Sequence, residues 1–103
     1  MDYIEAICSL DANNMKDLAY RFRGEFSNFC FVGASEQNDK VMLTLMFSDS
    51  LVDKGLDAGK IVREAAKYIK GGGGGQKFYA TAGGKDKDGI AKAIQYIKEQ
   101  IQK

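Results

Sequence analysis

The sequence predicts an α/β (α+β) sandwich in which a small mixed β-sheet is flanked by helices, in the order βαββααβα. Three observations support this fold class. Residues 40–47 form a nearly unbroken apolar run, which is typical of a strand covered on both faces. Apolar residues recur at helical spacing in three other segments, which would supply the covering helices. The 103 residues, 45% of them hydrophobic, fit a single domain (1–103) with one core.

The first 26 residues predict a strand and then a helix. Tyr3 to Cys8 is a short apolar run with one charge, which favours a strand. Asp11 is a good N-cap for the following helix, and Gly24 weakens its last turn. The apolar face of this helix comprises Met15, Leu18, Ala19, Phe22 and Phe26.

The next segment predicts a β-hairpin. Asn28 to Ala34 is rich in Phe and Val, and only Thr44 interrupts the apolar run from Lys40 to Phe47. The five polar or small residues between them, 35–39, predict a hairpin loop.

Capping residues then mark two helices. Ser48 can cap a short helical turn that Gly55 ends. Asp57 can cap a longer helix over 58–70, whose small pair Ala58-Gly59 lets the first turn press close against a neighbour. The residues that this helix buries are Ile61, Val62, Ala65, Ala66 and Ile69.

The last part of the chain predicts one more strand and one more helix. Phe78 to Ala82 is a short extended segment, and Asp86 caps the final helix. The apolar stripe of this helix comprises Ile90, Ala91, Ala93, Ile94, Ile97 and Ile101.

The composition excludes several classes of function. The chain has no histidine, so it lacks Ser-His-Asp and Cys-His pairs and has no set of four soft ligands for zinc. We predict no catalytic and no metal site, and we expect Cys8 and Cys30 to be buried thiols. No apolar run approaches the roughly 20 residues that span a bilayer, and residues 1–5 lack a signal-peptide pattern. These features predict a cytoplasmic protein without a membrane partner.

The net charge of +1 conceals an asymmetry along the chain. Residues 1–56 hold five bases against nine acids, a net of −4, whereas residues 57–103 hold ten bases against five acids, a net of +5. This asymmetry favours a polyanionic partner for the basic half. Lysines that simply solvate two C-terminal helices would give the same composition.

Five consecutive glycines, Gly71 to Gly75, follow the helix over 58–70, and Gly71 suits its C′ position. Glycine loses more backbone entropy on ordering than any other residue, so the run must be compensated. It indicates either a close-packed crossing or a ligand cradle, and the run alone does not decide between them. No G-x-x-x-x-G-K-[ST] motif is present, because Gly84-Lys85 is followed by Asp86.

A phosphate would be favoured where Gly83-Gly84-Lys85 leads into the last helix, because free N–H groups and the helix dipole meet there. If the glycine run folds back, bare backbone from 73–75 and 83–84 would meet beside Lys77 and Lys85. The carboxylate of Asp86 competes for the same N–H groups, so we expect this site to be weak.

Several strings together resemble one known family. They are Asp57-Ala58-Gly59-Lys60, Ala65-Ala66, the glycine run and Ala80-Thr81-Ala82-Gly83-Gly84-Lys85-Asp86. This pattern resembles the C-terminal C-Ala domain of bacterial alanyl-tRNA synthetases, a DHH-associated module, over nearly the whole chain. The spacing from Gly73-Gly74-Gly75 to Ala82-Gly83-Gly84 is its most specific part. The sequence departs from the family at Gln76-Lys77, where an Arg-Pro pair is common.

The resemblance implies that the chain is a C-terminal segment of a much larger enzyme, which joins alanine to its tRNA with ATP and edits misacylated tRNA elsewhere. It implies ATP, magnesium and zinc for that enzyme, and no cofactor here. It also implies that this module binds the outer corner of the alanine tRNA, works with other synthetase domains and contributes to dimerisation. The candidate nucleic-acid-binding residues are Arg63, Lys67, Lys70, Gly71, Gly72, Gly73, Gly74, Gly75, Gln76, Lys77, Gly83, Gly84 and Lys85.

Two alternatives accompany this hypothesis. In the first, the glycine run only lets helices pack closely, and the exposed face serves self-association of the synthetase. In the second, the chain is the C-terminal substrate-binding domain of a DHH-family phosphoesterase, which would require an Asp-His-His metal centre upstream.

Overall fold

One five-stranded sheet runs through the middle of the molecule, in the order β1-β2-β3-β5-β4. The computed structural model describes residues 2–8, 12–25, 28–37 and 40–102. β1 pairs with β2 in parallel and the other neighbours pair antiparallel, so the predicted mixed sheet is confirmed. The elements are β1 (Asp2–Cys8), α1 (Ala12–Glu25), β2 (Phe29–Gln37), β3 (Lys40–Phe47), α2 (Asp49–Asp53), α3 (Ala58–Ala65), the 3₁₀ turn η1 (Ala66–Ile69), β4 (Gly72–Gly75), β5 (Tyr79–Gly84), the 3₁₀ turn η2 (Lys87–Gly89) and α4 (Ile90–Gln102).

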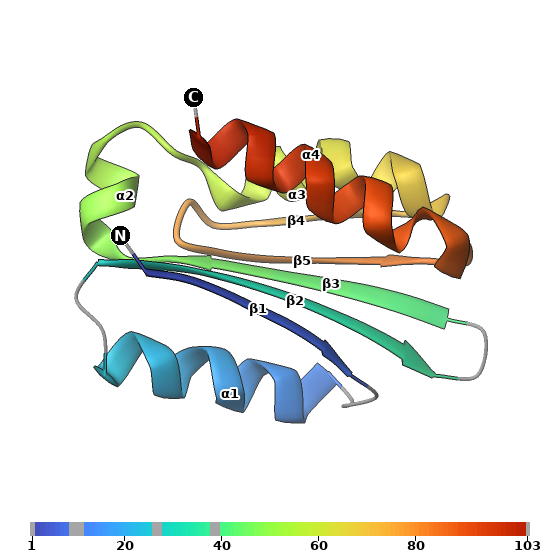
Figure 1. The fold of residues 1–103 in the computed structure, drawn as a ribbon, viewed down its shortest axis with the longest axis horizontal. Helices are drawn as coiled ribbons and strands as arrows, with labels where there is room; N and C mark the ends of the chain where they lie inside the picture. Colours follow the sequence, from blue (N-terminus) through green and yellow to red (C-terminus); the bar gives the residue numbers. More distant parts are fainter. Residues whose placement is uncertain (1, 9–11, 26–27, 38–39, 103) are drawn as a thin grey trace.

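Helices cover both faces of this sheet, as Figure 1 shows. On one face, Met15 and Ala19 of α1 pack against Phe29, Phe31 and Met46. On the other face, α3 and α4 enclose a larger core. The central strand β3 is buried along almost its whole length from residue 41 to residue 47, so the prediction of a strand covered on both sides is confirmed.

One predicted helix cap is confirmed in full. The carboxylate of Asp57 accepts a hydrogen bond from the backbone N–H of Lys60 at 3.2 Å, and α3 begins at the next residue. Gly55, with φ of 99°, follows α2 as predicted. Asp86 accepts from the N–H of Asp88 at 3.1 Å, but it caps the turn η2 that precedes α4. In α4 the predicted stripe is buried or half-buried except at Ala91, which is exposed.

The glycine run forms a strand, β4, that the sequence did not predict and that raises the number of strands from four to five. The element order is therefore βαββααββα. Gly72 to Gly75 pair antiparallel with Gly83 to Ala80 of β5. The hydrogen bonds of this ladder and close contact with α3 offset the backbone entropy that the glycines lose on ordering.

Three local predictions were wrong. Residues 35–37 continue β2, with Gln37 opposite Lys40, so the hairpin loop is shorter than predicted. The hydroxyl of Ser48 makes no capping bond, because it accepts the backbone N–H of Phe29 at 3.0 Å. The helix over 58–70 tightens into η1, and Lys70 rather than Gly71 adopts the left-handed conformation, with φ of 54°.

Some predictions fall outside the described part of the chain. They concern Asp11 as a cap, Phe26 as the end of an apolar face, and the side chain of Cys8. Within the described residues, none of the helices has the length and apolar character needed to cross a bilayer.

Cys30 provides a test of the core on the α3 and α4 side. Its side chain is fully buried, and burial raises the pKa of the Cys30 thiol well above its usual range. The thiolate is the reactive form, so iodoacetamide at pH 8 should modify Cys30 only when denaturant is added. Site-resolved mass spectrometry of the alkylated chain measures this. Modification of native Cys30 at the rate of a free cysteine would contradict the burial of β2.

Candidate functional site

The glycine strand β4 forms an exposed edge of the sheet that carries no side chains. β4 and β5 form a hairpin in which the N–H of Gln76 donates to the carbonyl of Tyr79 at 2.9 Å. Gly71, Gly72, Gly73 and Gly75 are exposed and Gly74 is half-buried. An edge strand of this kind offers unpaired main-chain groups to a partner.

Close packing explains every second glycine of the run. A Cβ atom at Gly71, Gly73 or Gly75 would collide with the main chain of β5. On the other side of β4, a Cβ at Gly59 of α3 would lie 2.7 Å from the carbonyl oxygen of Gly75. The predicted close approach of the first turn of α3 is therefore confirmed, and its neighbour is the glycine strand itself.

Gly84 has a similar reason, because a Cβ there would collide with the carbonyl of Ile69, but Gly72, Gly74 and Gly83 have none. A Cβ at Gly72 would meet nothing within 4 Å, one at Gly74 would meet only Nη2 of Arg63 at 3.7 Å, and one at Gly83 would meet only the carbonyl oxygen of Val41 at 3.9 Å. None of the three has a positive φ that would require glycine. The fold tolerates side chains there, so these positions leave main chain bare toward solvent.

Near this strand, backbone N–H groups at the start of α3 and just before η2 donate to carbonyls of the same chain. The N–H groups of Lys85 and Asp86 donate to the carbonyl of Ile69 at 2.8 and 3.0 Å. The N–H groups of Ala58 and Gly59 donate to the carbonyls of Lys77 and Gln76 at 2.9 and 3.1 Å. The N–H of Lys85, which the sequence suggested as a donor to a phosphate, is thus engaged within the chain. A polyanion on this surface would have to be held mainly by side chains.

The basic candidates are spread along the edge rather than gathered at one point. Lys77 lies at the turn of the β4–β5 hairpin, whereas Lys70 and Lys85 lie at its open end. Bare backbone of the two glycine segments does meet, where Gly72 pairs with Gly83, but Lys77 and Lys85 do not lie together there, because the six residues of β5 span about 20 Å. Arg63 of α3 lies between these ends, with Nη2 beside Gly74.

Lys67 differs from the other basic candidates because it has a partner in the fold. Its ammonium lies 2.9 Å from Oε2 of Glu64. The hydrogen bond to Glu64 and the charge of that carboxylate raise the pKa of Lys67. Lys67 therefore offers less free positive charge to a polyanion than Arg63, Lys70, Lys77 or Lys85.

The sequence reasoning missed an aromatic cluster beside the glycine strand. The rings of Tyr20 in α1 and Tyr79 in β5 lie with centroids 5.6 Å apart. Burial, with a smaller contribution from Tyr20, raises the pKa of Tyr79. The i, i+4, i+7 spacing of Lys16, Tyr20 and Arg23 was the available signal, since it places them on one flank of α1.

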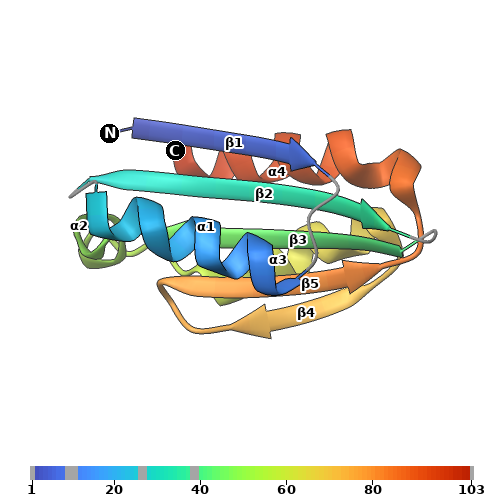
Figure 2. The same cartoon turned by 90° about the horizontal axis from the view of Figure 1, so that it is seen from below.

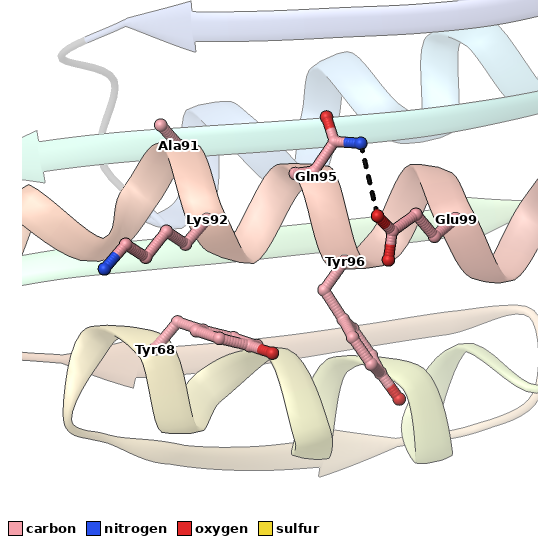
Figure 3. A pocket seen from close by; sticks show the side chains of 6 residues that line it. All are labelled: Tyr68, Ala91, Lys92, Gln95, Tyr96 and Glu99. Carbon is pink, nitrogen blue, oxygen red and sulfur yellow. Dashed lines mark hydrogen bonds between the residues drawn. The ribbon is translucent and has the colours of Figure 1, made fainter.

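A groove lies on the outer surface of the helical layer formed by α3, η1 and α4 (Figure 3). It has a volume of about 350 Å³ and is lined by Tyr68, Ala91, Lys92, Gln95, Tyr96 and Glu99. The rings of Tyr68 and Tyr96 lie 5.9 Å apart, and Nε2 of Gln95 donates to Glu99 at 3.4 Å. Nothing in this lining pairs a nucleophile with a base.

The described residues do not fit the metal ions and ATP that the resemblance implies for a full enzyme. Among the described residues, no three potential ligands of the Cys, Asp or Glu type cluster closely enough to hold a metal ion. The glycine motif follows a helix and has no Lys-Ser/Thr pair for a nucleotide phosphate.

Comparisons with known proteins agree on one family. The DHHA1 domain model matches residues 3–103. An alanine–tRNA ligase from Bacteroides thetaiotaomicron is 50% identical over 93% of this chain and 11% of that protein. One from Natranaerobius thermophilus is 37% identical over 88% of this chain and 10% of that protein. The chain thus spans about a tenth of the length of these curated relatives.

A solved structure has the same fold. The C-Ala domain from the alanyl-tRNA synthetase of Aquifex aeolicus superposes with a TM-score of 0.88 at 27% identity, over 98% of this chain and 91% of that domain.

Adjacent glycines provide a matched test of the packing. Gly73→Ala should lower the free energy of unfolding by about 1–3 kcal/mol, because its Cβ would collide with the main chain of Thr81 and Ala82. Gly72→Ala should change it by no more than about 0.5 kcal/mol, because the added atom meets nothing. Urea unfolding of both variants checks the difference. Equal losses would mean that β4 is not pressed against β5.

Proposed function

The chain belongs to the DHHA1 domain family, and we propose that it binds and positions tRNA as the C-Ala domain of an alanine–tRNA ligase. The observation that carries this proposal is the exposed glycine edge: Gly72 and Gly74 of β4, with Gly83 beside them in β5, leave main chain bare without an internal reason. Bare main chain lets a sugar-phosphate strand come closer than any side chain would permit. Arg63, between the two ends of the edge, can contact such a strand at its middle.

The charges along the edge suit a strand rather than a single phosphate. From Gly71 to Gln76 the extended backbone covers about 17 Å. Lys77 stands at one end of this distance, and Lys70 and Lys85 stand at the other. Such spacing allows several phosphate contacts, and these give binding that tolerates sequence and weakens with salt.

We propose that the chemistry of the full enzyme lies outside this chain. Ligation of alanine to tRNA with ATP, editing of misacylated tRNA, and the binding of magnesium and zinc would belong to other domains of the same synthetase. This domain would help those sites reach one tRNA in the cytoplasm by holding its outer corner.

Charge reversal tests the proposal. Lys77→Glu combined with Lys85→Glu should weaken binding of an alanine-accepting tRNA and lower the slope of log affinity against log salt by about 2, because each contact contributes about one. Fluorescence anisotropy over a salt series measures both quantities. The matched control is Arg21→Glu with Lys92→Glu, which changes the net charge equally at exposed positions on α1 and α4.

The outcome separates three cases. A loss confined to the edge variant supports the proposal. An equal loss in both double variants would point to net charge alone, and no binding by the unaltered chain would contradict a role in holding tRNA. Sedimentation velocity at two concentrations tests self-association in the same samples. If the chain dimerises and the edge variant leaves its tRNA affinity unchanged, the alternative of a self-association module would be favoured.

A further inference from the structure

One side of the sheet remains open next to the glycine strand. α1 packs over β2 and β3, whereas α3 contacts β4 and β5 from the opposite side. In Figure 2, β4 emerges beyond α1 with no described helix over it. Tyr79 packs toward α1, and strand alternation in β5 places Thr81 and Gly83 on the same side. We call these three residues the open sheet face.

The open sheet face borders the flank of α1 that carries Lys16, Tyr20 and Arg23. Tyr20 is 40% exposed and its ring lies 5.6 Å from that of Tyr79, at an interplanar angle of 52°. The ammonium of Lys16 lies 6.0 Å from the centroid of the Tyr20 ring. The exposed ring of Tyr20 and the ammonium of Lys16 therefore lie at the border of the open sheet face, which has few side chains.

Arg23 lies at the other end of this flank and anchors it to neighbouring elements. Its guanidinium lies 4.3 Å from the centroid of the Phe78 ring, and Nη2 lies 3.1 Å from Oδ1 of Asp49. Phe78 leads directly into Tyr79, so these contacts hold α1 and the start of β5 together. The two tyrosines are therefore supported by contacts on either side and present a preformed surface.

We propose that Tyr20 and Tyr79 form a stacking platform for an unpaired base of bound RNA, with Lys16 near the adjoining phosphate. Proteins recognise RNA loops by stacking splayed bases on aromatic side chains, and every base has a face that can stack. Thr81 and Gly83 are small, so the sugar of such a nucleotide could lie against β5. Its strand could then continue across Gly74, which pairs with Thr81, onto the glycine edge. This proposal rests on the proposed function.

The second tyrosine pair is less suited to this role. Tyr68 and Tyr96 lie in the groove of Figure 3, on the opposite side of the sheet. Glu99 lines that groove, and Glu64 binds Lys67 beside it. The negative charge of Glu99 would repel a phosphate in that groove, whereas the carboxylate of Asp49 is paired with Arg23.

Leucine substitutions test the platform against this groove. Tyr20→Leu should weaken binding of the alanine-accepting tRNA about tenfold, while the salt slope stays unchanged because no phosphate contact is lost. Tyr20→Phe should bind within twofold of the unaltered chain. Tyr68→Leu is the matched control, because Tyr68 is 42% exposed, much like Tyr20, and it should also stay within twofold. Thermal unfolding of each variant confirms that the fold is kept.

A fluorescent reporter provides an independent measurement. The sequence contains no tryptophan, so Tyr20→Trp introduces a single indole. We expect tRNA to quench its emission by stacking, and to leave the emission of a Tyr68→Trp variant unchanged.

Each result has a definite meaning. Binding by the unaltered chain with no loss in Tyr20→Leu and no quenching in Tyr20→Trp would overturn the platform and leave the proposed function standing. A tenfold loss in Tyr68→Leu instead would place the base in the groove. Failure of the unaltered chain to bind tRNA would overturn the platform and the proposed function together.

Discussion

The fold depends on contact between glycine main chain and its neighbours at distances that a Cβ atom would not allow. Gly71, Gly73 and Gly75 lie directly against β5. Gly59, which lacks a Cβ, lets the first turn of α3 pack against the main chain of Gly75. The same contacts let the carbonyls of Gln76 and Lys77 accept the first N–H groups of α3. The glycine strand therefore links the helical layer to the sheet. Because it is built from main chain, it also leaves an edge that carries no side chains.

This construction separates what holds the domain together from what faces outward. The first N–H groups of α3, and those of Asp88 and Gly89 in η2, donate to carbonyls and carboxylates of the chain itself. Anion binding is then left to side chains along the edge and to bare main chain at positions such as Gly72, which packing does not explain. The tyrosine platform extends this surface onto the open side of the sheet, where sequence-tolerant stacking can accompany phosphate contacts.

The sequence predicted those features of the fold that side-chain patterns encode. The apolar run of β3, the Asp57 cap and the mixed sheet between helices follow from burial and local hydrogen bonding, and all are present. β4 was missed because glycine has no side chain whose alternation could mark a strand; its pairing with β5 defines it. The separation of Lys77 from Lys85 and the meeting of Tyr20 with Tyr79 depend on tertiary pairing, which local patterns do not contain.

The central claim is that RNA approaches the bare main chain of β4. The most direct test is a titration of the ¹⁵N-labelled chain with alanine-accepting tRNA, followed by amide chemical shifts. We expect the amides of Gly72 to Gly75 and of Gly83 to shift or broaden first, while those of β1, at the opposite edge of the sheet, stay in place. Changes confined to β1 or to α4, with the glycine amides unmoved, would contradict it.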